Sequence, residues 1–210
     1  IFAVSKVKAT FLTLRWIAHR HPAMVREIVA GGHELASHGY CHFRVDSQSP
    51  EEFRADIRRT KAILEDIGGV EVRGYRAATF SVGASTPWAW PVLEEEGYRY
   101  SSSIYPVARD NYSNPDAPRS VYKPVGVRDL IEVPIATVRV GSKNYPAGGG
   151  GYFRLLPYSV SRAALRRINH HDRLPAVFYI HPWEVDPDQP RPSGVSAKSR
   201  FRHYTNLAKT

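Results

Sequence analysis

Residues 32–42 read GHELASHGYCH, and they are the most informative segment of the sequence for the fold class. Glu34 to Ser37 predicts a short strand, and the polar segment after it carries two histidines, His38 and His42. Polar side chains that follow a buried strand are typical of the sites of α/β proteins, which lie at the carboxyl ends of the strands. The stretch therefore indicates a strand that ends in a candidate functional loop.

Helices and strands alternate on both sides of this stretch. Upstream, Val7 to Leu14 predicts a strand, and Trp16 to Ala30 predicts a helix that Pro22 divides. Downstream, Ser49 is the N-cap of the clearest helix and forms a capping box with Glu52. Alternation of this kind is typical of parallel βαβ units, so the sequence predicts the α/β class, as an open sheet or a barrel.

The rest of the chain continues the pattern. Further strands are predicted at Val72–Tyr75, Tyr98–Ser101, Ile131–Val140 and Ala176–Ile180, and further helices at Pro87–Glu96 and Pro157–Asn169. The run Gly148 to Gly151 predicts a flexible turn; it is not a phosphate loop, because no Lys-Ser or Lys-Thr pair follows it. The tail from Pro182 is proline-rich and predicted to be irregular. The length of 210 residues indicates a single domain.

Composition limits the classes of partner. The net charge is +9, but no run of five like charges occurs, so we expect no nucleic-acid partner. No apolar run is long enough to cross a membrane, and no signal peptide opens the chain, which favours a cytoplasmic location. Cys41 is the only cysteine, so no internal disulfide can form.

His38 and His42 are the strongest candidates for chemistry. Two imidazoles four residues apart in a loop can bind one divalent ion such as zinc. The chain has nine histidines, so a pair at this spacing also arises by chance, and spacing alone leaves both interpretations open. The nearby His33 and Glu34 resemble a zinc-protease motif, but His38 comes one residue too late for it, and we reject that reading.

Two other polar positions follow predicted strands. Arg76 is either a surface group or a residue that orients a carboxylate. His181 is either a cap on the sheet or an acid–base group, and Trp183 either packs on the core or forms an apolar wall against a sugar.

In this order, the segments resemble the polysaccharide deacetylase (NodB-like) family. Residues 32–42 are similar to its metal-binding histidine motif, Gly74–Ala77 to its arginine motif, and Tyr179–Glu184 to its late histidine motif. Residues 148–158, 186–191 and 201–207 resemble more narrowly the subgroup associated with exosortase (PEP-CTERM) and exopolysaccharide loci, which makes 182–210 a subgroup-specific C-terminal extension.

The resemblance implies a distorted (β/α) barrel that removes N-acetyl groups from a polysaccharide with a divalent metal, zinc being favoured. In the family, one Asp and two His hold the metal, and a second Asp is the base. The site residues transfer as follows: His38 and His42 as ligands, His181 as general acid, Arg76 as the residue that orients the base, and Trp183 and Tyr75 as substrate-binding residues.

The chain departs from the family pattern at several positions. The two aspartates of the family precede the segment equivalent to Val7, and nothing acidic precedes Glu27 here. We therefore expect an N-terminally truncated domain without its first strand. Ala78 replaces a proline, and Ser101 replaces an aspartate. The alternatives are a non-catalytic glycan-binding or degenerate relative and, from the charge alone, a basic nucleic-acid-binding module.

Overall fold

The computed structural model describes residues 2–108, 114–191 and 193–209. The chain divides into two compact units. Unit 1 comprises residues 1–104, 109–114 and 121–133, and unit 2 comprises residues 105–108, 115–120 and 134–210. Two compact units can belong to one domain, so the single domain over 1–210, with 182–210 as an extension, stays a prediction.

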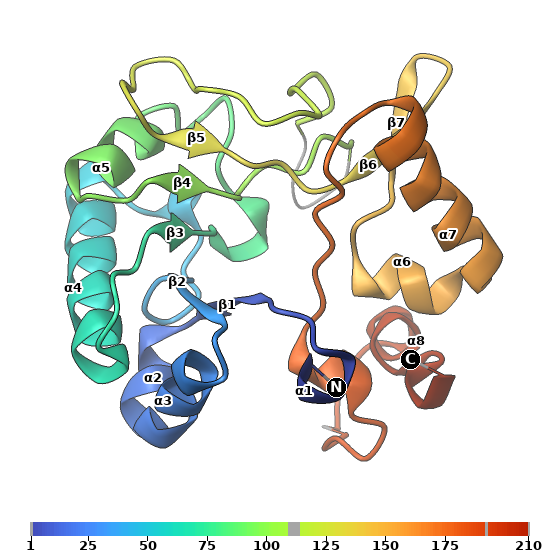
Figure 1. The fold of residues 1–210 in the computed structure, drawn as a ribbon, viewed down its shortest axis with the longest axis horizontal. Helices are drawn as coiled ribbons and strands as arrows, with labels where there is room; N and C mark the ends of the chain where they lie inside the picture. The colour runs from blue at the N-terminus through green and yellow to red at the C-terminus, as the bar shows by residue number, and fades with distance from the viewer. Residues whose placement is uncertain (1, 109–113, 192, 210) are drawn as a thin grey trace. The chain divides into compact units, whose positions relative to one another are not determined.

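A parallel sheet forms the centre of unit 1, with its strands in the order β1-β2-β3-β4-β5 (Figure 1). The strands are β1 Thr10–Thr13, β2 Glu34–Ser37, β3 Gly74–Tyr75, β4 Tyr100–Ser101 and β5 Ile131–Glu132. All four pairings are parallel, because a helix or a long loop returns the chain between successive strands. The α/β class is confirmed, and the sheet formed by the described residues is open, with β1 and β5 at its edges.

One helix precedes β1, and the others connect β1 to β2, β2 to β3 and β3 to β4. They are α1 Phe2–Ser5, α2 Arg15–Arg20, α3 Pro22–Ala30, α4 Pro50–Gly68 and α5 Ala89–Glu95, with 3-10 turns η1 Val45–Ser47 and η2 Ala78–Phe80. The predicted break at Pro22 is confirmed, since this residue begins α3. The capping box is confirmed too: the Glu52 backbone N–H donates to Ser49 Oγ, and the Ser49 N–H donates to the Glu52 carboxylate.

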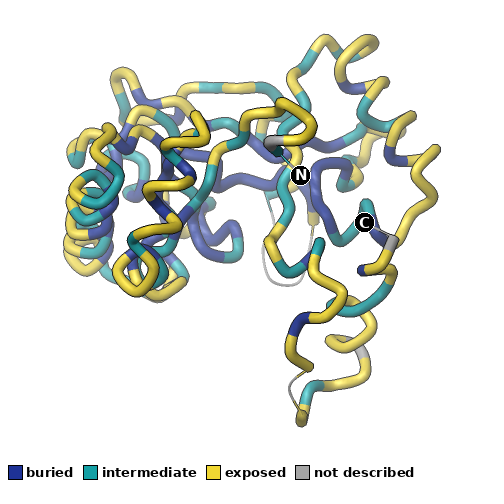
Figure 2. Tube along the Cα trace, turned by 60° about the horizontal axis from the view of Figure 1, so that its bottom comes forward, coloured by how far each residue is buried: buried dark blue, intermediate teal, exposed yellow. Residues whose placement is uncertain are grey.

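Helix α4 supplies much of the core of unit 1. It packs against α2, α3, α5 and β2. Its buried face is formed by Phe53, Ile57, Thr60 and Leu64, which recur at the predicted helical spacing. Figure 2 shows exposed positions along the outer sides of the helices and buried stretches between them. Each large apolar side chain buried in this way stabilises the fold by about 1.5–3 kcal/mol.

The Glu94 carboxylate holds the segment that leads into β5. It accepts hydrogen bonds from the backbone N–H groups of Arg128, Asp129 and Leu130 at 2.6–3.0 Å. These bonds, led by the one from Asp129, lower the pKa of Glu94 from 4.5 to about 2. The folded chain therefore binds a proton here less readily than the unfolded chain does.

We expect Glu94→Gln to lower stability at neutral pH. The stability contributed by the carboxylate is complete above about pH 4.5 and is lost as the pH falls through about 2. Urea unfolding should show a difference between wild type and Glu94→Gln that shrinks across this range. The exposed control Glu27→Gln should show no such trend, and a difference independent of pH would contradict this role.

Unit 2 contains a hairpin and several helices. The hairpin is β6 Thr137–Val140 with β7 Lys143–Pro146, paired antiparallel. The helical elements are α6 Gly150–Leu155, α7 Tyr158–Arg166, the π-helical turn η3 Arg167–His171, the 3-10 turns η4 Pro182–Val185 and η5 Leu207–Lys209, and α8 Ala197–Tyr204. Ala136, Ala147 and Ile168 form its buried core. No described helix of the chain has the length and hydropathy needed to cross a membrane.

The structure corrects four predictions in this region. The strand predicted over Ile131–Val140 is two strands in different sheets, β5 and β6, and Pro134 between them has no N–H to donate to a ladder. The strand predicted at Ala176–Ile180 forms only an isolated parallel bridge, from Tyr179 to Gly149. The tail from Pro182 is not irregular throughout, because α8 lies within it.

The fourth correction concerns the run Gly148 to Gly151. It is not a loose turn, because α6 begins at Gly150. A Cβ atom on Gly148 would lie 2.2 Å from the Val177 carbonyl oxygen, and one on Gly150 would lie 2.4 Å from the Glu184 carboxylate. The glycines are needed for close packing in unit 2.

Candidate functional site

The two candidate ligands lie together in the loop after β2. The His38 backbone N–H donates to the Thr13 carbonyl, which aligns the loop with the end of β1. His38 Nδ1 lies 2.7 Å from the Arg76 carbonyl oxygen. A carbonyl can only accept, so Nδ1 carries the proton and Nε2 carries the lone pair. The His42 ring lies 5.0 Å from the His38 ring, centroid to centroid, and His42 has φ 61°.

This arrangement fits part of a metal site. Metal-binding histidines commonly donate their other ring N–H to a backbone carbonyl, which fixes the tautomer and the ring orientation. His38 has this arrangement, and His42 is close enough to share an ion with it. Catalytic zinc sites use three protein ligands, and no cluster of three or more His, Cys, Asp or Glu suited to an ion occurs in the described part of the chain. The residues fit as two ligands of an ion.

Arg76 joins this loop to the end of β4. Its carbonyl holds His38, while its Nε donates to the Ser102 carbonyl and its Nη2 donates to Ser102 Oγ, each at 2.8 Å. The backbone N–H of Ala77 donates to Ser103 Oγ. The structure thus brings Arg76, His38 and His42 together at one end of the sheet. The role of the Arg76 guanidinium in orienting a base stays a prediction.

Sequence reasoning missed Glu132, the last residue of β5, which pairs with Ser101 of β4. Its carboxylate is fully buried and accepts from the backbone N–H groups of Ser103 and Ile104 and from Trp90 Nε1. Burial raises the pKa of Glu132 above its ordinary value. It orders the segment after β4 to which Arg76 binds. A single carboxylate inside the apolar run 130–136 was the available signal.

Tyr75 does not have the role expected for it. Its side chain is only 2% exposed, and its ring packs against Phe53 and Tyr98. A ring buried in the core of unit 1 cannot contact a substrate. The prediction that the Tyr75 side chain binds substrate is therefore wrong in this structure.

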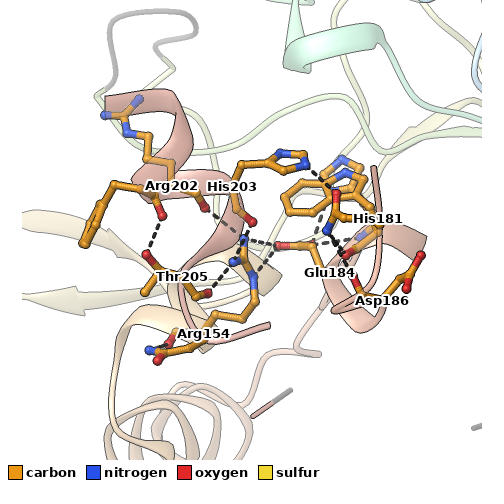
Figure 3. A network of polar contacts seen from close by, with 11 residues as sticks. Arg154, His181, Glu184, Asp186, Arg202, His203 and Thr205 are labelled. Carbon is orange, nitrogen blue, oxygen red and sulfur yellow. Dashed lines mark hydrogen bonds and ion pairs between the residues drawn. The ribbon is translucent and has the colours of Figure 1, made fainter. Parts of the chain in front are cut away.

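In unit 2, Glu184 orients His181. Both the backbone N–H and the Nδ1 of His181 lie within hydrogen-bond distance of Glu184 Oε2, at 2.9 and 3.2 Å (Figure 3). Burial acts to raise the pKa of Glu184, but the bonds from His181 and Arg154 bring the pKa below its ordinary value. An ionised carboxylate can only accept, so it selects the His181 tautomer that carries a proton on Nδ1.

Trp183 lies half-buried between polar neighbours. It stacks on His203 at 3.9 Å and on His181 at 5.5 Å between ring centroids, both at 17°. The Arg154 guanidinium lies 5.1 Å from the centroid of the Trp183 ring. These contacts fix the indole within unit 2. Its role in binding substrate stays a prediction.

Arg154 joins Glu184, and with it the His181 and Trp183 side chains, to the end of α8. Its guanidinium forms a buried ion pair with Glu184, whose two side chains are 1% and 2% exposed. It also donates to the carbonyl oxygens of Arg202, His203 and Thr205 at 2.7–3.2 Å (Figure 3). A helix leaves its last carbonyls without partners, and Arg154 satisfies them. Residues 184 and 202–205 are thereby held around one cation.

Unit 1 thus combines a parallel α/β sheet with paired histidines at one end of it, and residues 1–101 match the family model "Polysaccharide deacetylase". Residues 102–210, just over half of the chain, match the family model "Domain of unknown function (DUF3473)". The chain belongs to this second family, and the residues before that region are those that match the polysaccharide deacetylase model.

Two curated relatives match part of the chain. The chain is 35% identical over 63 residues to a peptidoglycan-N-acetylglucosamine deacetylase of Bacillus cereus, covering 30% of this chain and 23% of that protein. It is 28% identical over 83 residues to a peptidoglycan deacetylase-like protein of Gibberella zeae, covering 40% and 24%. The chain thus spans about a quarter of the length of these curated relatives.

Solved structures share the fold. The structure of a polysaccharide deacetylase from Mycobacterium smegmatis matches with TM-score 0.63 and 26% identity, over 86% of this chain and 60% of that one. A CE4 family pseudoenzyme from Bacillus anthracis matches with TM-score 0.54 and 13% identity, over 99% of this chain and 52% of that one. The first match supports the expected deacetylase fold, and the second shows the fold alone.

Proposed function

We propose that the protein removes N-acetyl groups from a polysaccharide with a divalent metal, zinc by preference, held in part by His38 and His42. The observation that carries the proposal is the His38 tautomer, whose Nδ1 is bound to the Arg76 carbonyl so that Nε2 presents its lone pair. When bound, the metal would polarise the amide carbonyl and activate a water molecule.

His181 supplies the proton for the leaving amine. An amide nitrogen leaves readily only when it is protonated, and a histidine suits that task near neutral pH. Its Nδ1 is held by Glu184, so proton transfer falls to Nε2. In this proposal Arg76 orients the general base, which in the resembled family is an aspartate with no counterpart in these 210 residues, and Trp183 borders the sugar.

The polymer is a polysaccharide of N-acetylated sugars. The bacterial relative with 35% identity is a deacetylase of peptidoglycan N-acetylglucosamine, which supports that substrate class. The resemblance of residues 148–158 and 201–207 to the exosortase-associated subgroup favours a role in exopolysaccharide biosynthesis. The cytoplasmic location favoured by the sequence stays a prediction.

Acetate release tests the proposal directly. The gene product that contains this chain, loaded with zinc, should release acetate from N-acetylglucosamine oligomers and should stop doing so in EDTA. Release that is equal with and without metal would sink the metal-dependent mechanism. Absence of release from every N-acetylated oligomer tested would sink the deacetylase proposal.

We expect His38→Ala to lose zinc affinity by more than about a hundredfold, because even residues behind the ligands contribute roughly 10–100-fold. Isothermal titration of the chain with zinc measures this change. The exposed His170→Ala is the matched control and should bind like wild type. Equal affinity in His38→Ala and wild type would exclude His38 as a ligand.

A second candidate is a non-catalytic glycan-binding relative. It is favoured by Ser101, whose hydroxyl donates to Ser103 Oγ at the position where the resembled subgroup has an aspartate. The Bacillus anthracis pseudoenzyme shows that this fold also occurs in a pseudoenzyme. Saturable binding of N-acetylglucosamine oligomers without acetate release would favour this candidate over the enzyme.

A further inference from the structure

A cavity of about 280 Å³ opens in unit 1 beside α2. It is lined by two arginines, two aromatic residues and a histidine: Arg15, Trp16, His19, Arg20 and Tyr40. No carboxylate is among these lining residues. The cavity therefore carries two permanent positive charges next to aromatic rings, and the metal-site proposal makes no use of it.

Arg15 is the lining residue that has a hydrogen-bond donor without an acceptor in the described part of the chain. It is only 7% exposed, and its guanidinium lies 4.3 Å from the centroid of the Tyr40 ring. Its Nε has no hydrogen-bond partner among the described residues. Leaving a buried charged donor without an acceptor costs free energy, so an acceptor that entered the cavity would be favoured.

Asp56 is the carboxylate that the charge of Arg15 affects, but it does not accept a hydrogen bond from the Arg15 guanidinium. The charge of Arg15 acts on Asp56, but that carboxyl accepts hydrogen bonds from Thr60 and from the Tyr40 backbone. Arg15 forms no hydrogen bond to it. The guanidinium thus lies against the Tyr40 ring, and its buried Nε–H has no acceptor among the described residues.

The aromatic part of the cavity points to a sugar. The Trp16 side chain is 47% exposed, and the Arg20 guanidinium lies 5.7 Å from the centroid of its ring. An exposed indole suits the apolar face of a pyranose ring. A guanidinium matches the two oxygens of a carboxylate. A neutral sugar would leave both arginines unmatched, and a bare phosphate would leave Trp16 without a partner.

We propose that this cavity binds a uronic acid unit of the polymer, with its carboxylate on Arg15 and its ring against Trp16. The inference rests on the proposed function for the view that the ligand is a polysaccharide. It narrows the substrate class to polymers that contain acidic sugars alongside N-acetylated ones. Arg20 and His19 complete the rim of the site.

Calorimetric titration with tri-galacturonate in EDTA tests the proposal without using the metal site. Wild type should bind it in preference to tri-N-acetylglucosamine. Arg15→Gln should weaken binding by roughly tenfold to a hundredfold, the range for a hydrogen bond to a charged group. Trp16→Ala, at an exposed position that tolerates truncation, should weaken binding too. The exposed Arg26→Gln on α3 is the control and should bind like wild type.

Each contrary result overturns the proposal. Equal affinity for tri-galacturonate and tri-N-acetylglucosamine would show that the cavity does not recognise the carboxylate. Inorganic phosphate that binds as tightly as tri-galacturonate makes the cavity a general anion site. Single-stranded RNA bound more tightly than the trimer, with loss in both variants, identifies a nucleic-acid site instead. Acetate release is measured separately, so failure of uronate binding leaves the deacetylase proposal standing, and the reverse also holds.

Discussion

Arg154→Met is expected to lower the free energy of unfolding by about 3–5 kcal/mol, the range measured when one partner of a buried ion pair is removed. The substitution leaves the Glu184 carboxylate buried without its cation. It also removes the donors to the carbonyl oxygens of Arg202, His203 and Thr205. Urea unfolding of the chain, followed by circular dichroism, measures the change.

The matched control is Arg162→Met, on the exposed surface of α7, which should leave stability close to that of wild type. Adding Glu184→Gln to Arg154→Met should restore part of the loss, because a neutral amide leaves no uncompensated charge. Wild-type stability in Arg154→Met would show that the cluster around Arg154 does not hold unit 2 together.

His181→Ala is expected to lower kcat for acetate release by about 10²–10⁴-fold, the usual contribution of a positioned acid–base group. Zinc affinity and melting temperature should change little, because the His181 side chain is 53% exposed and is no metal ligand in the proposal. The measurement is acetate release by the zinc-loaded gene product at saturating substrate.

Two further variants define the role of His181. Glu184→Gln keeps the imidazole but weakens the acceptor at Nδ1, and it also leaves Arg154 without its anion. With kcat normalised to the folded fraction measured by circular dichroism, kcat should fall less than in His181→Ala. The exposed His170→Ala should keep wild-type kcat. An unchanged kcat in His181→Ala would remove this residue from the mechanism, and an equal loss of zinc affinity would make it a ligand instead of an acid.

Local signals determined several elements correctly. Ser49 and Glu52 lie three residues apart, so the start of α4 depends on neighbours in sequence. Pro22 begins α3 because its ring constrains its own backbone. The buried strand Glu34–Ser37, with His38 directly after it, was readable from four consecutive residues. These features need no information from distant parts of the chain.

Other features depend on residues far apart in sequence. The strand expected over Ile131–Val140 is divided between two sheets because each half finds a different partner, β4 for one and β7 for the other. The burial of Tyr75 depends on Phe53, from α4, and on Tyr98, from the segment between α5 and β4. The periodicity of apolar residues in the sequence indicates which positions are buried. It does not indicate which other element packs against them.

The histidine loop shows both kinds of information. Local patterns were enough to predict the parallel α/β class and the strand that ends at Ser37, with His38 and His42 after it. Three contacts became visible only in the folded chain: the Arg76 carbonyl selects the His38 tautomer, Glu132 orders the segment bound by Arg76, and Arg154 neutralises Glu184. The reason is physical: hydrogen bonds and buried charges act over a few ångströms, and folding alone brings such distant residues within that range.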